Sequence, residues 1–389
     1  MDIALCYESV LPARGGCEMY IGDLARRLAA DGHNVHLYAS SWDESALPSA
    51  VHYHALPVPR GPRFLRPWRF AAACAKVLRT ERHQVSIGFN KTWGQDILYP
   101  QGGLHAASAA CNLRKYRTPF MRGLARVIKA LDLGHRSFSL LERRQYLGPD
   151  RPLIVVNSHM VQNHFPHFFG FNPNQIRVIH SAIDPGRFSE QDRPRRRLEW
   201  RQRWGLAPED VVGLFVAMNY RLKGLEPLLR AVARVKVDQS FRLLIVGDPR
   251  TAAFERQARR LGISDRVCFA GYYRDTSNCY FASDFLVHPT FYDPCSLVVL
   301  EALACGLPVI TSRFNGASEL LDPPHDGFVV ADPHDANHLA ECISQMLDPP
   351  LRQERAKVAR QRAARWTFEH HYRQLLQVFT EAAVRKWAA

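Results

Sequence analysis

Short apolar runs alternate with amphipathic helical segments along most of the chain. The first two runs, at 3–7 and 35–39, are separated by a Gly15-Gly16 turn and by apolar residues with helical spacing. Strand, glycine turn, helix and strand in this order predict a βαβ unit with parallel strands. The same alternation returns after residue 210. The sequence therefore predicts an α/β fold with two doubly wound domains.

The alternation also indicates where the chain divides. We expect an N-terminal domain at 1–172, a C-terminal domain at 173–366 and an amphipathic C-terminal helix at 367–389, whose apolar stripe needs a groove to cover it. Ligands of doubly wound sheets bind outside the carboxyl ends of the strands. A binding cleft is therefore expected between the two domains.

The composition excludes a disordered polybasic chain. The 389 residues are 47% hydrophobic, and 51 Lys and Arg against 37 Asp and Glu give a net charge of +14, most of it within 1–200. This excess favours an anionic partner. The nine cysteines include no CxxC pair, and the sequence shows no export signal or membrane-spanning run, which predicts a cytoplasmic protein with reduced thiols.

Two acids eight residues apart, Asp293 and Glu301, flank an apolar helical pattern. A proline follows Asp293, which is typical of the first turn of a helix, and Glu301 would lie about two turns later. The backbone amides of Cys295, Ser296 and Leu297 would open this helix, where unpaired N–H groups and the helix dipole favour an anion. The segment predicts a phosphate site whose flanking carboxylates bind hydroxyl groups.

A second polar segment follows the first strand of the C-terminal sheet and contains Asn219, Arg221 and Lys223. Cations at this edge would stabilise a diphosphate leaving group, which is the task of a metal ion in other transferases. The sequence contains no Asp-x-Asp and no cluster of His, Cys and Asp with metal-ligand spacing. We therefore predict chemistry that requires neither a metal nor a cofactor.

These segments resemble those of the retaining glycosyltransferases of family 4. The resemblance covers nearly the whole chain. It rests on the Gly15-Gly16 turn, the segment 219–224, the Asp293-x7-Glu301 element with its continuation to Val309, and the stretch 178–188. Within the family, the segments 88–96 and 40–42 and the Gly15-Gly16 turn are similar to those of the lipopolysaccharide core glucosyltransferases that add glucose to inner-core heptose. The resemblance implies the GT-B fold, in which two Rossmann-like domains face each other across a nucleotide-sugar cleft and the C-terminal helix packs back on the N-terminal domain.

The resemblance also implies roles for these residues. Glu301 would bind the ribose of the nucleotide, Asp293 the hydroxyls of the donor sugar, and the amides of Ser296 and Leu297 the diphosphate. Lys223 would be the catalytic phosphate cation, with Asp293 as a second catalytic candidate.

The chain departs from the family pattern at two of these positions. The residue directly before the catalytic lysine is basic in the glucosyltransferases but is Leu222 here, and Arg221 is expected to substitute for it as a catalytic cation. The first acid of the motif is usually Glu, and Asp293 is one methylene shorter. The identity of the donor sugar therefore stays open.

The N-terminal domain offers further candidates. Gly15 and Gly16 would let the backbone approach the donor, and Glu18 would face it; the alternative is a plain tight turn. The later glycines of a dinucleotide fingerprint are missing, which argues against a dehydrogenase. His105 lies where the family often has an acceptor-side catalytic histidine, although a purely structural histidine fits equally well.

Two residues near His105 in the sequence are assigned structural roles. Asp96 is interpreted as a buried structural acid and Lys91 as a surface residue. Both rank below His105 as candidates for a role in catalysis.

The window 114–144 contains nine basic and two acidic residues. After Thr118 and Pro119, a cap and first residue of a helix, an apolar stripe from Phe120 to Leu131 is flanked by cations. The pattern predicts a helix on an anionic membrane surface, a region that the resemblance also implies. The alternative is a helix that packs its stripe on its own domain.

Together these features predict a retaining transfer of a sugar from a UDP-sugar, with glucose as the first candidate sugar. The acceptor would be a saccharide or a lipid-linked glycan in the biosynthesis of lipopolysaccharide or another cell-envelope glycan. The enzyme would be cytoplasmic and peripheral on the inner face of the membrane. Alternatives are a nucleotide-sugar epimerase or phosphorylase on the same fold, or a basic module that binds nucleic acid. Aromatic residues do not interleave with the charge, so no specific nucleic acid is expected.

Overall fold

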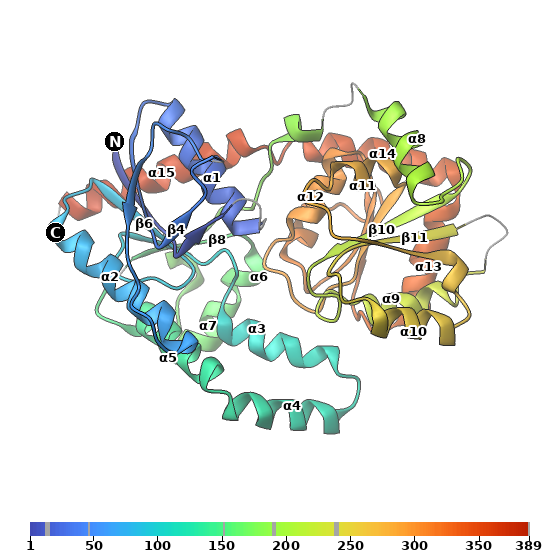
Figure 1. Cartoon of the computed structure of the whole chain (residues 1–389), viewed down its shortest axis with the longest axis horizontal. Coiled ribbons are helices and arrows are strands. Elements are labelled where there is room, and N and C mark those ends of the chain that lie inside the picture. The colour runs from blue at the N-terminus through green and yellow to red at the C-terminus, as the bar shows by residue number, and fades with distance from the viewer. Residues whose placement is uncertain (12–15, 46, 151, 189–191, 237–240, 388–389) are drawn as a thin grey trace. The chain divides into compact units, whose positions relative to one another are not determined.

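The computed structural model describes residues 1–389 except 12–15, 46, 151, 189–191, 237–240 and 388–389. The chain forms two compact units, each built on a parallel sheet (Figure 1). The first unit contains Met1–His180 and His371–Ala389, and the second contains Ser181–His370. The division falls after His180 rather than after 172, because the strand at 176–178 pairs within the first sheet.

In the first unit, buried apolar runs form a parallel sheet with the strand order β5-β3-β1-β6-β7-β8-β9. The strands of this sheet are β1 (Asp2–Cys6), β3 (Asn34–Ala39), β5 (His52–Ala55), β6 (Val85–Phe89), β7 (Ile97–Tyr99), β8 (Leu153–Val156) and β9 (Ile176–Val178). A short pair joins β2 (Ser9–Val10) to β4 (Ser41–Trp42). The helices are α1 (Gly16–Ala30), α2 (Arg66–Thr80), α3 (His105–Asn112), α4 (Pro119–Leu131), α5 (Leu133–Leu147), α6 (His159–Gln162), α7 (His164–Phe169) and most of α15 (Phe368–Trp387).

The second unit repeats this plan with the strand order β12-β11-β10-β13-β14-β15, again parallel. Its strands are β10 (Val211–Ala217), β11 (Phe241–Gly247), β12 (Val267–Gly271), β13 (Phe285–His288), β14 (Val309–Ser312) and β15 (Gly327–Val330). Its helices are α8 (Arg193–Arg203), α9 (Leu225–Val232), α10 (Ala252–Arg260), α11 (Ser277–Ala282), α12 (Leu297–Ala304), α13 (Ala336–Leu347) and α14 (Pro349–Ala363). Both units are therefore doubly wound α/β structures, as predicted.

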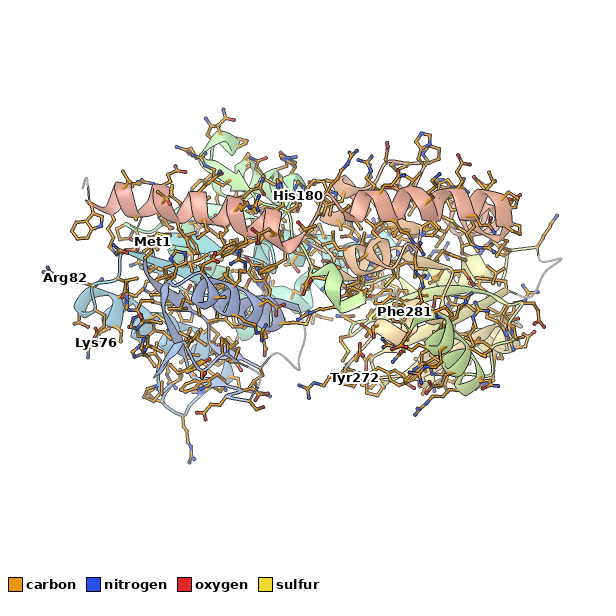
Figure 2. The ribbon with its side chains drawn as sticks, turned by 90° about the horizontal axis from the view of Figure 1, so that it is seen from above. Met1, Lys76, Arg82, His180, Tyr272 and Phe281 are labelled. Carbon is orange, nitrogen blue, oxygen red and sulfur yellow. The ribbon has the colours of Figure 1, made fainter. Side chains whose placement is uncertain are left out.

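The C-terminal helix returns to the first unit. Tyr20 Oη lies 2.6 Å from His371 Nε2, and His371 Nδ1 lies 2.7 Å from the carbonyl oxygen of His180, which Figure 2 labels beside this helix. Near its other end, Lys386 Nζ donates to Asp96 Oδ2 at 3.0 Å. Asp96 Oδ2 also accepts hydrogen bonds from the backbone and hydroxyl of Ser86. The expected packing of the C-terminal helix is confirmed, and Asp96 has a structural role in it.

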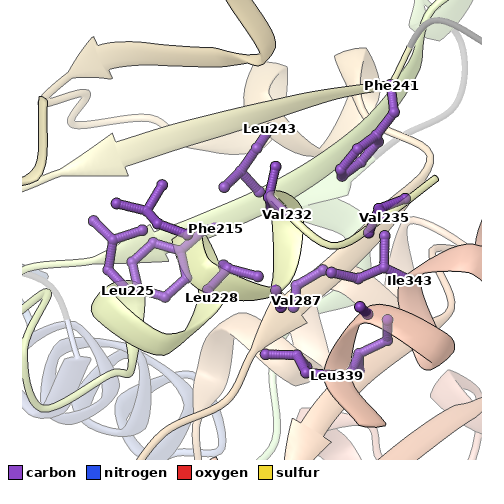
Figure 3. Close-up of a cluster of buried hydrophobic side chains, with 14 of the residues drawn as sticks. Phe215, Leu225, Leu228, Val232, Val235, Phe241, Leu243, Val287, Leu339 and Ile343 are labelled. Atoms are coloured by element: carbon purple, nitrogen blue, oxygen red, sulfur yellow. The ribbon is translucent and has the colours of Figure 1, made fainter. Parts of the chain in front are cut away.

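The core of the second unit fixes the helices that carry its loops. Figure 3 shows α9 and α13 meeting β10 through side chains that are almost fully buried, among them Phe215, Leu228 and Ile343. Burial of a large apolar side chain contributes roughly 1.5–3 kcal/mol relative to exposure. Packing of this kind holds the start of α9 at the carboxyl end of β10.

Candidate functional site

Two loops meet at the carboxyl edge of the second sheet, one after β10 and one after β13. These strands are neighbours, with Leu214 opposite Leu286. The loops join through their backbones, because the amide of Phe291 donates to the carbonyl oxygen of Leu222 at 2.9 Å. The predicted polar segments at 219–224 and 290–297 therefore lie side by side.

Gly224 makes this close approach possible. Its φ of +85° belongs to the left-handed region, and a Cβ at this position would lie 2.1 Å from the carbonyl oxygen of Pro289. Side-chain-bearing residues avoid both the conformation and the contact. Gly224 thus sets the spacing between the two loops.

We expect Gly224→Ala to lower the free energy of unfolding by roughly 2–4 kcal/mol, because left-handed strain and overpacking add. Gly262 is the matched control, since its φ is +70° but a Cβ at this position would meet open space, with nothing within 4 Å beyond its chain neighbours. Gly262→Ala should therefore cost only the strain, about 1–2 kcal/mol. Denaturant unfolding measures both variants, and equal losses would contradict the proposed contact with Pro289.

Lys223 and Asp293 form an ion pair across the two loops. Lys223 Nζ lies 2.6 Å from Asp293 Oδ2 and donates to the carbonyl oxygen of Tyr292 at 3.1 Å. Burial alone would raise the pKa of Asp293, but the charge of Lys223 and the hydrogen bonds from Lys223 and Ser296 outweigh burial and hold this pKa below its usual value. Asp293 is therefore ionised at neutral pH, and a cation stands beside it.

His288, at the end of β13, is a member of this group that the sequence did not single out. Its side chain is buried, and its Nδ1 makes no hydrogen bond to the described residues. Burial and the nearby Lys223 charge lower the pKa of His288 to about 3, so it is neutral at pH 7. Its place inside an apolar strand made it look like an ordinary core residue.

Because His288 is buried in its neutral form, we expect the free energy of unfolding to fall in acid. Below a pKa of about 6.5 the unfolded chain binds a proton at His288, while the folded protein does not until about pH 3, so stability present above pH 6.5 is lost as the pH falls. The wild type should lose about 2 kcal/mol more than His288→Asn between pH 7 and pH 5. The exposed His338 gives the control, since His338→Asn should keep the wild-type pH dependence of unfolding.

The helix beside these loops begins later than expected. Its first residue is Leu297, with Ser296 as the N-cap, and Asp293 lies outside it in an isolated parallel bridge with Asn315. The backbone N–H of Asp293 donates to the carbonyl oxygen of Phe314 at 2.9 Å. Asp293 is thus positioned by the loop after β14 rather than by a helical turn.

Asn315 accepts a hydrogen bond from one of the backbone amides that were predicted to bind phosphate. This buried side chain accepts a hydrogen bond from the Ser296 amide at 3.2 Å and from the Ala317 amide at 3.1 Å, and it donates to Thr311 Oγ1 at 3.0 Å. The Ser296 amide therefore has a protein acceptor, contrary to expectation. Leu297, as the first helical residue, keeps an amide without an intrahelical acceptor.

The remaining donor-side candidates differ in their surroundings. Cys295 is buried and hydrogen-bonded to Ser181, and burial raises the pKa of its thiol to about 12, so the side chain is a neutral packing group. Asn219 and Arg221 are exposed, and the Asn219 side chain accepts from the Leu222 amide at 3.1 Å. Arg221 makes no ion pair with the described residues, which leaves its charge available.

Glu301 lies one turn inside α12 and is partly buried. The hydroxyl of the buried Tyr280 donates to Glu301 Oε2 at 2.5 Å. Burial raises the pKa of Glu301, while Tyr280 and the charge of Arg187 act against the rise. The carboxylate is thus oriented by a tyrosine that the sequence patterns did not reveal.

The N-terminal candidates lie in the first unit. Gly15 falls outside the described residues. Gly16 opens α1 with an exposed backbone and a φ of +53°. Glu18 accepts a hydrogen bond from the Leu11 amide at 2.7 Å, so its carboxylate holds the chain after β2.

His105 lines a pocket of about 550 Å³ in the first unit, together with Glu8, Arg66, Asn90 and Lys91. Its Nε2 lies 2.8 Å from His135 Nδ1. Burial, with His135 and Lys91 nearby, lowers the pKa of His105 to about 4. The imidazole is therefore neutral at pH 7, and a neutral imidazole can donate a hydrogen bond to a hydroxyl group or accept one from it.

Two charged residues lie close to His105. Glu142, from α5, is buried and accepts hydrogen bonds from the amides of His105 and Ala106, which open α3. Burial raises the pKa of Glu142 to about 7. Lys91, expected at the surface, is instead partly buried, with Nζ 3.3 Å from the centroid of the Phe138 ring.

The apolar stripe of α4 does not pack on its own unit. Helix α4 contains no buried residue, and Phe120 and Leu131 are 79% and 70% exposed. Meanwhile Lys129 Nζ donates to the carbonyl oxygen of Ala109 at 3.0 Å. No helix among the described residues is long and apolar enough to cross a membrane.

Comparison with known proteins identifies the family. A model described as Glycosyltransferase Family 4 matches residues 14–187, and one described as Glycosyl transferases group 1 matches 209–349. The chain is 27% identical over 366 residues to the lipopolysaccharide glucosyltransferase WaaG of Escherichia coli, covering 92% of this chain and 93% of that protein. A probable transglycosylase of Burkholderia thailandensis is 31% identical over 384 residues, covering 95% and 94%.

Solved structures agree with this result. The crystal structure of WaaG, described as a glycosyltransferase involved in lipopolysaccharide biosynthesis, superposes with a TM-score of 0.78 at 25% identity and covers 98% of both chains. Anabaena HepE, solved with UDP and glucose, has a TM-score of 0.68 at 22% identity, with 98% of this chain and 99% of that chain covered. The chain belongs to the GT-B glycosyltransferases of family 4 and is an enzyme of sugar transfer.

Proposed function

We propose that this enzyme transfers glucose from UDP-glucose to a saccharide or lipid-linked glycan of the cell envelope, with the lipopolysaccharide core as the first candidate acceptor. Support comes from the glucosyltransferase activity named for WaaG and from the UDP and glucose named for HepE. The observation that carries the proposal is the Lys223–Asp293 pair, with its 2.6 Å contact beside the start of α12. It combines a phosphate cation with a hydroxyl-binding carboxylate.

The residues of the second unit would act on the donor as follows. As the bond to diphosphate breaks, negative charge grows on the leaving group, and Lys223 and Arg221 stabilise it together with the Leu297 amide. Asp293 accepts hydrogen bonds from sugar hydroxyls, and Glu301 accepts them from the ribose. No metal ion is required in this scheme, because protein cations supply the positive charge.

The first unit would hold the acceptor. The pocket around His105 is lined by the cations Arg66 and Lys91 and by the carboxylate of Glu8, and such groups bind saccharide hydroxyls and acidic substituents. We propose that the acceptor attacks from the face that the diphosphate leaves, and that this diphosphate takes the acceptor proton. The configuration at the anomeric carbon is then retained without a protein nucleophile.

Product analysis tests the reaction. Purified protein with UDP-glucose, EDTA and delipidated lipopolysaccharide core should yield an α-glucosylated core, whose anomeric configuration is read by NMR. An inverted β-product, or activity restored only by added Mg²⁺, would overturn the retaining, metal-free assignment. Conversion of UDP-glucose to another UDP-hexose without any acceptor would instead identify an epimerase.

We also propose that the enzyme works at the cytoplasmic side of the membrane, with α4 within the basic stretch 114–144 lying on anionic lipid. Leu124→Glu should lower binding to phosphatidylglycerol-containing vesicles by roughly tenfold, because an exposed apolar contact is replaced by a charge that anionic lipid repels. Leu198→Glu is the control, since Leu198 is equally exposed within the basic helix α8. Vesicle sedimentation measures both, and equal loss in the two variants would contradict a specific role for α4.

A further inference from the structure

A cluster of imidazoles and a carboxylate lies at one edge of the first sheet. Parallel pairing sets Asp2 of β1 opposite Asn34 of β3, and His36 of β3 opposite His52 of β5. Because side chains alternate along a strand, Asn34 and His36 share one face of the sheet. The loop before β6 adds His83, and Figure 2 shows the neighbouring Met1 and Arg82 at the same end of the unit.

Three donor atoms of this cluster converge. The Asp2 carboxylate contacts His83 Nδ1 and lies 3.4 Å from His36 Nε2, and one donor atom from each of the three residues lies within 4.8 Å of the others. Donors around a tetrahedral Zn²⁺ with bonds of about 2.0–2.1 Å lie roughly 3.3 Å apart. We propose that Asp2, His36 and His83 form a binding site for a divalent transition metal such as Zn²⁺. None of the three lines the pocket around His105.

Each of the three proposed ligands is also oriented by an outer hydrogen bond. His83 Nε2 lies 2.8 Å from Tyr38 Oη, and His36 Nδ1 lies 2.8 Å from His54 Nε2. Asn34 Nδ2 donates to Asp2 Oδ2 at 2.7 Å. Partners of this kind fix the tautomer of a metal-bound imidazole and the orientation of a carboxylate. With a metal on His83 Nδ1, its Nε2–H donates to the Tyr38 hydroxyl.

The three proposed ligands differ in their exposure to solvent. The side chains of His83, His36 and Asp2 are 5%, 17% and 32% exposed. The cluster offers two imidazole nitrogens and a carboxylate oxygen, a donor set that suits Zn²⁺.

The site would act as a structural clamp. An ion here joins the start of β1, the middle of β3 and the loop before β6. The carbonyl oxygen of His83 accepts a hydrogen bond from Lys386 Nζ at 3.1 Å, so the same loop also anchors the C-terminal helix. Because the ion binds only the folded unit, it raises stability in proportion to the logarithm of its concentration over Kd. The transfer reaction proposed above does not use it.

Titration of the full-length, tag-free and EDTA-stripped protein with ZnCl2 tests the site. We expect one site with a Kd of about micromolar or below, a higher Tm with Zn²⁺, and no response to MgCl2, since hard cations prefer oxygen ligands. His36→Gln and His83→Gln should each weaken binding by about 10–100-fold or more. His52→Gln is the matched control, because His52 stacks on His36 without donating an atom to the site.

Further readouts separate a lost ligand from a lost fold. Asp2→Asn keeps the shape of the side chain and should weaken Zn²⁺ binding while circular dichroism and UDP binding stay normal. The proposal is overturned if the wild type binds no Zn²⁺, or if His36→Gln and His83→Gln bind it as tightly as His52→Gln does.

Discussion

Lys223→Ala should lower kcat for glucosyl transfer by about 10²–10³-fold while the protein stays folded, because a preorganised charge aimed at a developing anion contributes this much. The lysine lies in a fixed position, with Nζ 2.6 Å from Asp293 Oδ2 and 3.1 Å from the carbonyl oxygen of Tyr292. Its charge is therefore in place before the leaving group becomes negative. Steady-state kinetics with UDP-glucose measures the effect.

Substitutions of two other cations serve as a control and a comparison for Lys223→Ala. Lys236→Ala, at an exposed position of the same unit, should leave kcat unchanged. Arg221→Ala should cost less than Lys223→Ala, because Arg221 is exposed and no described residue fixes its side chain. Near-normal turnover by Lys223→Ala would remove this lysine from the mechanism.

Glu301→Gln should raise KM for the donor by about 10–100-fold with little change in kcat, since hydrogen bonds from ribose hydroxyls to a charged acceptor contribute roughly 1.5–3 kcal/mol. The ribose takes no part in bond breaking, so the loss falls on binding rather than turnover. Kinetics at varied UDP-glucose concentration separates the two parameters. A fall in kcat without a change in KM would contradict the assignment of Glu301 to the ribose.

A substitution of Tyr280 tests the same assignment of Glu301. Tyr280→Phe removes the hydroxyl that donates to Glu301 Oε2 and should raise KM by a smaller factor, because the carboxylate remains but is less well oriented. Glu341→Gln, at an exposed position on α13, serves as the neutral control and should leave KM unchanged.

Local patterns in the sequence were sufficient to predict the two parallel sheets and the proximity of the two loops that carry Lys223 and Asp293. Parallel strands place their carboxyl ends at one edge, so Lys223 and Asp293 were expected at one site although seventy positions separate them in the chain. The predicted helix start was wrong, because Pro294 suits a first turn but the backbone pairs Asp293 with Asn315 instead. Long-range backbone pairing of this kind leaves no periodic signal.

Residues that act through tertiary contacts escaped the sequence patterns for the same reason. Asn315, Tyr280 and Glu142 each satisfy a group on another element, and a single buried polar residue has no characteristic spacing. The Asp2, His36 and His83 cluster was also missed, since a search for metal-ligand spacing along the chain does not detect donors on separate strands. Only the pairing of β1 with β3 brings these donors together.

Calorimetric titration with UDP and UDP-glucose in EDTA, on the wild type and on Asp293→Ala, tests the central claim most directly. GDP and GDP-mannose serve as the competing donor class. We predict that the wild type binds UDP and UDP-glucose without a metal ion. Asp293→Ala should lose more affinity for UDP-glucose than for UDP, because Asp293 is assigned to the sugar hydroxyls. Binding of neither uridine ligand, or UDP-glucose binding untouched by Asp293→Ala, would contradict the account.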